Sequence, residues 1–136
     1  MLEFKVHHVC IQTNCYEESL RFYIDYLGFK VLKKNEFFSG RRYNTWLESA
    51  NFMIELQTPK LENVLNEWDS NTSGPVHLAF IVSDVEAAYT FFLKNGYSRF
   101  KFKGKKVIYS LNENSSLFKV FAPEGTEIEI RNAQLP

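Results

Sequence analysis

The sequence predicts an α+β protein built from two tandem βαβββ modules, and three observations support this fold class. The stretch at residues 6–12 reappears at residues 76–82, with His8 aligned on His77. Runs in which apolar and polar residues alternate, as they do in half-buried strands, follow each copy. The length of 136 residues and the apolar fraction of 45% are sufficient for one buried core. We therefore expect a single domain over residues 1–136, with modules at about 1–58 and 76–136 and a linker at about 59–75.

Composition excludes several classes of protein. Lysine plus arginine equals aspartate plus glutamate at 16 each, so no overall field favours nucleic acid or an acidic membrane surface. No apolar run approaches the roughly 20 residues that span a bilayer. The two cysteines follow no secretory signal and are expected to be reduced thiols. We expect a cytoplasmic protein that binds a small-molecule substrate.

The first module begins with a predicted strand at residues 4–13, in which Val9 and Ile11 occupy one face. Asn14 is expected to cap the helix that follows, with Glu17 as its capping-box partner, and Gly28 to end it. Three more strands are expected at residues 29–32, 43–47 and 52–57, with turns at 39–40 and 50–51.

The linker carries apolar residues at spacings of three and four, from Leu61 to Trp68, which predict a short amphipathic helix. The second module then repeats the first: a strand at 77–82 precedes a helix at 85–93 that Ser83 or Asp84 caps and Asn95-Gly96 closes. Strands are expected at 97–102, 107–111, 118–121 and 127–131, with a tight turn at 122–125. The basic run at 99–106 alternates with phenylalanines, which favours a strand or hairpin with a solvated face over a phosphate- or CoA-binding patch.

Strand alternation places a histidine and a glutamate from each module on the face turned away from the helix. These residues are His8 and Glu55 in the first module, and His77 and Glu129 in the second. A carboxylate between apolar neighbours is costly to bury unless it is paired, protonated or bound to a cation. Any one of the four taken alone is most simply an ordinary strand residue. As a matched set they predict one divalent metal, with Zn, Ni, Co, Mn or Fe suited to such ligands.

Two neighbours of His8 are expected to have structural roles. His7 should lie on the opposite face of the strand, and Cys10, on the same face as His8, is interpreted as a small packing residue. Tyr43, Trp46 and Met53, with phenylalanines of the second module, are candidates for lining an apolar pocket, although each fits a core position better.

Five segments in both modules carry a resemblance to a known family: residues 8–12, 19–23 with 27–29, 53–56, 77–82 and 123–130. In their order and spacing they resemble the vicinal-oxygen-chelate superfamily, which groups glyoxalase I, bleomycin-resistance proteins, extradiol dioxygenases, fosfomycin-resistance enzymes and methylmalonyl-CoA epimerase. The resemblance implies a U-shaped, mostly antiparallel sheet around a metal, with His8, Glu55, His77 and Glu129 as its ligands. It also implies a homodimer.

The ligand set looks most like that of glyoxalase I, a lyase that moves a proton next to a metal-chelated carbonyl through an enediolate. By this resemblance Glu129 is the base and Glu55 the opposing carboxylate. Four protein ligands leave two positions, which suit two adjacent substrate oxygens and leave none for O2, so a dioxygenase fits less well. An epimerase fits the same site. A non-catalytic binding protein is a further alternative, although such relatives commonly lack the ligand residues. No glutathione-binding set is identifiable, and residues 123–126 depart from the usual lead into the last strand.

Overall fold

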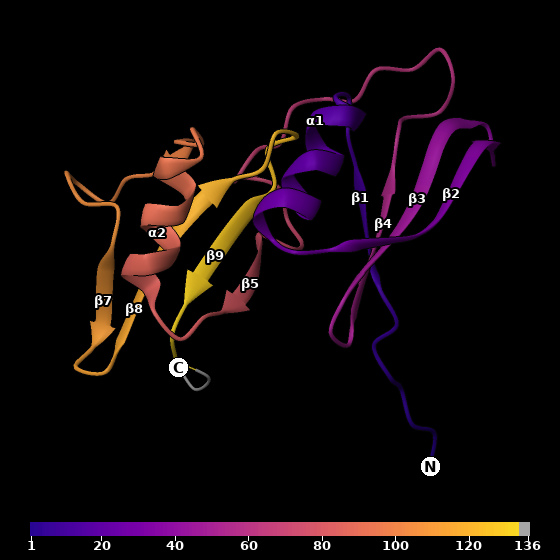
Figure 1. Ribbon diagram of the computed structural model, residues 1–136. Coiled ribbons are helices and arrows are strands. Elements are labelled where there is room, and N and C mark those ends of the chain that lie inside the picture. The colour runs from indigo at the N-terminus through magenta and orange to yellow at the C-terminus, as the bar shows by residue number, and fades with distance from the viewer. Residues whose placement is uncertain (134–136) are drawn as a thin grey trace. The chain divides into compact units, whose positions relative to one another are not determined.

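The computed structural model describes residues 1–133 (Figure 1), so the last three residues predicted for the second module lie outside the described part. The chain folds as two compact units, Met1–Glu67 and Trp68–Pro136. Each unit has its own sheet and its own helix, as the mixed α+β prediction requires. Within residues 1–133, no helix is long and apolar enough to cross a membrane.

The first unit has the predicted βαβββ order. It consists of β1 (Val9–Gln12), α1 (Tyr16–Arg21) continuing into the π-helical turn η1 (Phe22–Tyr26), β2 (Lys30–Phe38), β3 (Arg41–Ser49) and β4 (Phe52–Gln57). The strands lie in the order β1-β4-β3-β2. The outer strand β1 runs parallel to β4, whereas the other neighbours are antiparallel. The first and last strands of the module therefore lie side by side.

The second unit repeats this topology. It consists of β5 (His77–Ile81), α2 (Val85–Lys94), β6 (Phe100–Lys101), β7 (Tyr109–Asn112), β8 (Ser115–Phe121) and β9 (Glu127–Arg131). Its order is β5-β9-β8-β6, with β7 also paired to β8, and β5 runs parallel to β9 as β1 does to β4. The four strands expected after the helix are confirmed. Two of them, β6 and β7, together occupy the place that β2 alone fills in the first unit.

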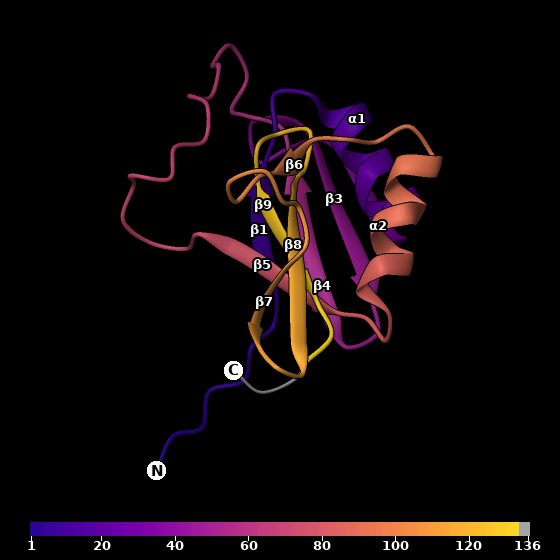
Figure 2. The ribbon, with the colours of Figure 1, turned by 90° about the vertical axis from the view of Figure 1, so that its left-hand side faces the viewer.

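Each sheet buries the apolar face that meets its helix (Figures 1 and 2). In the first unit Phe22 and Tyr23 are almost completely buried, as are Ile54 and Leu56 of β4. In the second unit Phe92 of α2 packs with its ring edge toward Phe118 and Phe100, and these three rings are also buried. Asp84 caps α2 as predicted, because its carboxylate accepts the N–H of Ala87. The opposite face of each sheet is left for polar side chains.

The start of the first module differs from the prediction. The strand begins only at Val9, and residues 4–8 precede it without strand pairing. Asn14 does not cap α1: the N-cap is Cys15, and no side chain caps the helix there. The Asn14 amide instead accepts the N–H of Leu65 and donates to its carbonyl, both at 3.0 Å. The capping-box prediction is wrong because Asn14 satisfies a remote backbone segment rather than the helix that follows it.

The amphipathic helix predicted for residues 61–68 is absent. Leu61 and Val64, which should have formed its apolar stripe, are 51% and 85% exposed. A short helix is marginal in water unless its apolar face packs on something, and here that face has no such support. Glu62 also has a positive φ of 70°, which is incompatible with a right-handed helix. The segment runs as an irregular connection.

Candidate metal centre

The same strand register positions the histidine and the glutamate in both units. In the first unit, Cys10 of β1 is the register partner of Glu55 on β4, and His8 lies two residues before Cys10. In the second unit, Ala79 of β5 is the partner of Glu129 on β9, and His77 lies two residues before Ala79. Residues two apart in an extended strand share a face, which accounts for the position of His77 next to Glu129. His8 precedes β1, and its closeness to Glu55 is shown by the distance between the two side chains. Each predicted histidine–glutamate pair is therefore brought together within its unit.

In the first unit the two side chains contact each other. His8 Nε2 lies 3.4 Å from Glu55 Oε1, and both side chains are partly exposed. The other carboxylate oxygen, Oε2, accepts a hydrogen bond of 2.8 Å from Asn44 Nδ2. The Trp46 ring lies beside His8, with 4.6 Å between ring centroids. Glu55 is therefore held in orientation by a neutral amide, and its Oε1 is turned to the imidazole.

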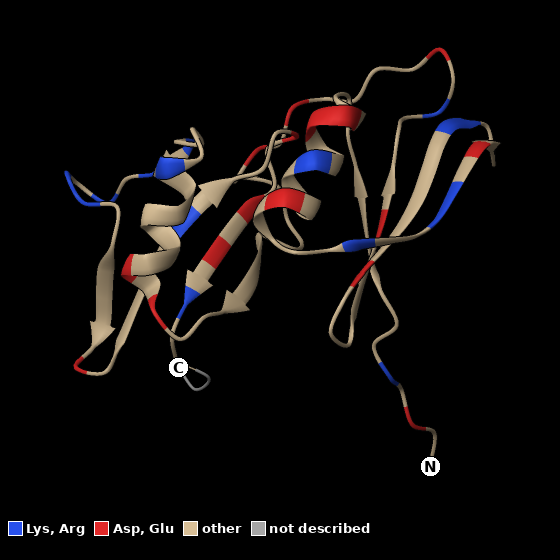
Figure 3. Ribbon diagram, viewed as in Figure 1, with Lys and Arg blue, Asp and Glu red and all other residues tan. Residues whose placement is uncertain are grey.

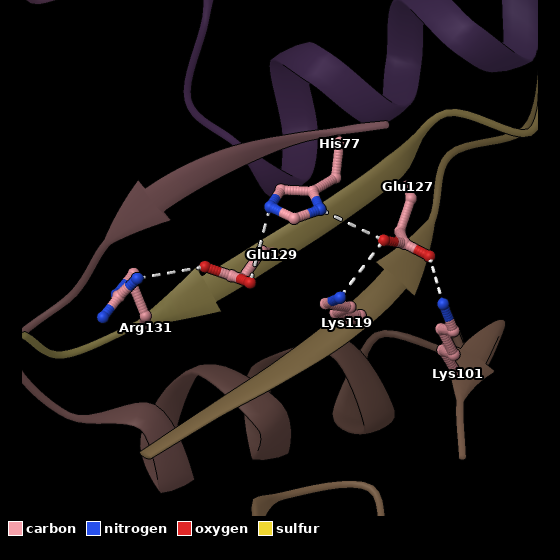
Figure 4. A network of polar contacts seen from close by, with 6 residues as sticks. All are labelled: His77, Lys101, Lys119, Glu127, Glu129 and Arg131. Atoms are coloured by element: carbon pink, nitrogen blue, oxygen red, sulfur yellow. Dashed lines mark hydrogen bonds and ion pairs between the residues drawn. The ribbon is translucent and has the colours of Figure 1, made fainter. Parts of the chain in front are cut away.

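The second unit has an equivalent pair (Figure 4). His77 Nε2 lies 3.6 Å from Glu129 Oε1, and Arg131 Nη1 lies 3.4 Å from Glu129 Oε2. Glu129 is 7% exposed. In both units the glutamate thus turns one oxygen to the histidine and the other to a side chain of the same sheet. The difference is that Arg131 is charged where Asn44 is neutral.

Glu127 belongs to the same cluster and was not predicted. It is completely buried, with its Oε2 3.3 Å from His77 Nδ1. Lys101 donates to its Oε1 at 2.7 Å, and Lys119 Nζ lies 3.3 Å from Oε2. Burial raises the pKa of Glu127, but the Lys101 hydrogen bond and the Lys119 charge outweigh burial and hold it below its usual value. Figure 3 shows acidic positions on β9 and a basic position on the neighbouring β8.

A pattern in the sequence could have found Glu127. It lies two residues before Glu129 on the same strand, so alternation places both carboxylates on one face. They reach opposite nitrogens of His77: Glu127 contacts Nδ1 and Glu129 contacts Nε2. A carboxylate at Nδ1 favours the tautomer that carries its proton there and leaves the Nε2 lone pair free.

One prediction about a neighbour of the site is wrong, and the preferred interpretation of another as a core residue agrees with the structure. His7 does not lie opposite His8, because their Nδ1 atoms are 2.8 Å apart. Both residues precede β1, where strand alternation no longer applies. Tyr43 belongs to the helix side of its sheet, where its ring stacks on Tyr16 at 4.4 Å. The Trp46 ring contacts that of His8, and a pocket lined by Trp46 and Met53 stays a prediction.

Cys10 lies beside Glu55 and has an unreactive thiol. Although the residue is exposed in part, burial of its thiol raises the pKa to about 11, and the negative charge of Glu55 adds to this effect. A thiol with this pKa is almost entirely protonated at neutral pH and is a poor nucleophile. Because Cys10 is exposed, the structure does not support its predicted role as a small packing residue.

The nitrogen–oxygen pairs fit a divalent metal in their chemistry and spacing. Two ligands at right angles, each about 2.1 Å from one ion, are separated by about 3 Å, close to the observed 3.4 and 3.6 Å. Within residues 1–133, no three His, Cys, Asp or Glu side chains are grouped so that they could hold a metal. In the second unit this is because Glu127 and Glu129 take opposite nitrogens of His77 and do not converge. Each unit therefore presents one histidine–glutamate pair, and no larger group of possible ligands, within the described residues.

Comparisons with solved structures show the same fold. The structure of SMU.1112c is 26% identical, with a TM-score of 0.76, over 95% of this chain and 98% of that one. A glyoxalase family protein from Enterococcus faecalis is 22% identical, with a TM-score of 0.76 and coverages of 94% and 97%. The trypanothione-dependent glyoxalase I of Leishmania major is 20% identical, with a TM-score of 0.69 and coverages of 96% and 87%. Among curated protein sequences, none matches this chain significantly.

The sequence profile of one family matches residues 7–109. This range is most of the chain and includes three of the four predicted ligands, His8, Glu55 and His77. The repeated βαβ topology, the matched histidine–glutamate pairs and the similar solved structures agree with that match. The chain belongs to the Glyoxalase/Bleomycin resistance protein/Dioxygenase superfamily, also called the vicinal-oxygen-chelate superfamily.

Proposed function

We propose that the protein is a metal-dependent lyase or isomerase of the glyoxalase I type, which transfers a proton at a carbon next to a chelated carbonyl. His8, Glu55, His77 and Glu129 are the proposed ligands of one divalent ion, with Ni, Zn, Co, Mn and Fe as candidates. The observation that supports this proposal is the equivalence of the two pairs. Each unit presents one imidazole nitrogen and one carboxylate oxygen, 3.4 and 3.6 Å apart.

The groups around each pair support a binding role over an accidental contact. Metal-bound histidines and carboxylates usually have a second hydrogen-bond partner that fixes their orientation. Here Asn44 holds the second oxygen of Glu55, and Glu127 faces the second nitrogen of His77. A divalent ion, when bound, supplies a Lewis acid that stabilises negative charge on a substrate oxygen. Glu127 is thus a positioning residue in this proposal.

Glu129 and Glu55 are the proposed proton carriers. A carboxylate that accepts and returns a proton must be ionised at rest and within reach of the substrate carbon. Arg131 lies near Oε2 of Glu129, whereas Oε1 faces His77 and would be the oxygen that binds the ion or, once released from it, takes the proton. Ile128 and Ile130 on either side of Glu129 are buried on the opposite face. In this proposal Glu129 would accept the proton from the substrate carbon, and the proton would return to the substrate either from Glu129 or, after exchange through solvent, from Glu55.

We also propose that the protein is a homodimer. The two pairs then meet either within one chain or between the first unit of one copy and the second unit of the other. Mixing His8→Ala with His77→Ala protein tells these arrangements apart. A site shared between chains regains metal binding in the mixed dimer, because one of its two sites is intact. A site within one chain regains none, and a monomer by sedimentation refutes the dimer.

Metal titration tests the ligand set directly. We expect about one divalent ion per chain, measured by calorimetry and elemental analysis after loading with Ni or Zn. Each of His8→Ala, Glu55→Gln, His77→Ala and Glu129→Gln should weaken binding by a similar factor if all four hold one ion. Glu48→Gln, an exposed glutamate on β3, is the matched control. Binding that survives in the second unit when the first is mutated contradicts a shared site, and no binding at all refutes the metalloenzyme.

Solvent-deuterium exchange tests the reaction. The Ni- or Co-loaded protein should exchange the proton next to the carbonyl in candidate hemithioacetals or 2-acyl-CoA esters. The exchange should disappear in Glu129→Gln if Glu129 is the base. Exchange that continues in this variant assigns the base elsewhere. A protein that binds metal tightly but exchanges no substrate proton is better explained as a binding protein of the same superfamily.

A further inference from the structure

The edge strand of the second unit is interrupted. β6 and β7 are both antiparallel to β8, with Lys101 opposite Lys119 and Tyr109 opposite Leu117. They therefore follow one another along the same edge of β8, separated by residues 102–108. The equivalent strand of the first unit, β2, runs unbroken from Lys30 to Phe38 apart from one register shift. The interruption is a feature of the second unit that the repeat does not explain.

A cavity opens at this interruption. It has a volume of about 160 Å³ and is half open to solvent. Its lining contains three lysines and two aromatic residues, namely Lys101, Phe102, Lys103, Tyr109 and Lys119. The side chains come from β6, β7 and β8, and from Phe102 and Lys103 in the segment between β6 and β7. The cavity therefore lies at the break in the strand.

The charges at the cavity do not cancel. Glu127 is the acidic partner of both Lys101 and Lys119, at 2.7 and 3.3 Å. Lys103 has no ion pair within residues 1–133, and its Nζ lies 4.5 Å from the centroid of the Tyr109 ring. Lys101 and Lys119 thus share one carboxylate and Lys103 adds a further positive charge, which leaves an excess of positive charge at a concave surface. Low-dielectric walls strengthen such a field and attract anions.

The aromatic residues add an apolar surface. Phe102 is 62% exposed, although it is large and apolar, and Tyr109 is partly exposed. An exposed phenylalanine next to lysines offers a planar surface to a ligand that also carries charge. We propose that this cavity binds an organic anion, a phosphate or carboxylate group attached to a planar or unsaturated body. The basic run, which the sequence indicated to be a solvated hairpin, is then a ligand site.

The position of the cavity relates it to the candidate metal centre. Lys119 is the register partner of Glu129, and Lys101 is the register partner of Lys119. Register partners in neighbouring strands share a face and lie about 5 Å apart, so the lysines are one and two strands away from Glu129. If the proposed metal function holds, the substrate is an anion whose charged end lies roughly 5–10 Å from its reacting carbonyl.

Titration of phenyl phosphate into the metal-free full chain tests the cavity without reference to the metal. The backbone amide signals of Lys101, Tyr109 and Lys119 in a nitrogen-15 NMR spectrum should shift as phenyl phosphate is added. Benzoate tests the carboxylate form of the ligand, and inorganic phosphate and benzyl alcohol test each part of it alone. We expect phenyl phosphate or benzoate to bind at least about tenfold more tightly than either part. Equal binding of benzyl alcohol refutes the role of the lysines, and equal binding of inorganic phosphate refutes the role of the aromatic rings.

A variant of Lys103 locates the binding site. Lys103→Ala should weaken phenyl phosphate binding by about tenfold, and Lys103→Glu by more, because a charged hydrogen bond becomes a repulsion. Lys103 has an exposed side chain, so both variants should fold normally, which melting curves check. Lys94→Ala, an exposed lysine at the end of α2, is the matched control. An equal effect of Lys94→Ala, or no effect of Lys103→Glu, overturns the proposal. If the protein binds phenyl phosphate but no metal, the proposed anion site at the cavity is supported and only the proposed metalloenzyme is refuted.

Discussion

Replacing Glu127 by glutamine tests the buried charge network at its centre. The substitution keeps the shape of the side chain but removes the charge that Lys101 and Lys119 share. The lost charge-assisted hydrogen bond to Lys101 costs about 1.5–3 kcal/mol. Part of this is regained, because the carboxylate no longer has to be desolvated in a fully buried position. However, Lys119 is left without its partner, and we expect a net loss of about 2 kcal/mol.

Urea unfolding at neutral pH measures this loss. The urea concentration at the midpoint should decrease, whereas the slope of the unfolding free energy against urea should stay constant, because the surface exposed on unfolding is unchanged. Glu113→Gln is the matched control: it makes the same charge change at an exposed position between β7 and β8. A surface substitution of this kind should alter stability by no more than about 0.5 kcal/mol. If Glu127→Gln is as stable as this control, the buried network does not stabilise the fold and our reasoning is wrong.

The same variant has a second, separable consequence under the proposed function. Glu127 faces His77 Nδ1, and loss of such a partner typically lowers metal affinity by about 10–100-fold. We expect calorimetry with Ni or Zn to show this decrease in Glu127→Gln but not in Glu113→Gln. A loss of stability without a loss of metal affinity assigns Glu127 a purely structural role.

Two further substitutions test the packing. Tyr16→Phe removes the hydroxyl bonded to the buried Thr45 and should cost about 1–2 kcal/mol. Burial raises the pKa of the Tyr16 hydroxyl, so above about pH 10 this group ionises more readily in the unfolded chain than in the folded one. The wild-type protein therefore loses stability as the pH rises through this range. Tyr16→Phe, which lacks the hydroxyl, should lose less stability in urea titrations at alkaline pH. Gly125→Ala adds a Cβ 3.1 Å from Trp68 at φ +100° and should cost about 1–3 kcal/mol. Gly104→Ala is the control: its φ is also positive, at +63°, but the added Cβ meets open space, so this variant should unfold at a higher urea concentration than Gly125→Ala.

The repeated pattern in the sequence predicted much of the fold. Strand β4 was predicted at residues 52–57, where the structure has it, because Ile54 and Leu56 alternate with Glu55 and Gln57. The same alternation placed Glu55 beside His8 and Glu129 beside His77 within their units. These predictions succeeded because the period of a half-buried strand fixes which face a side chain occupies.

Other features depend on partners that are remote in the sequence. Asn14 is a residue type that often caps helices, but its side-chain amide hydrogen-bonds to the backbone of Leu65 instead. The stripe beginning at Leu61 has helical spacing, but it lacks a surface to cover. Glu127 is stabilised by Lys101 and Lys119, which lie on two other strands. No local pattern contains these contacts, so sequence reasoning could not have found them.

The two units are alike in topology but differ in charge, and this difference has a chemical consequence. Glu55 is held by a neutral amide, whereas Glu129 lies near Arg131, with Lys119 beside it as its register partner. The first unit therefore offers ligands with little surrounding charge. The second unit combines its ligands with an excess of cations at the interrupted edge strand. Under the proposed function, a neutral substrate could bind in either direction, whereas an anionic one would favour the direction that brings its charge to the cations of the second unit. That preference would make the proposed proton carriers Glu129 and Glu55 unequal, even though the repeat makes them equivalent in position.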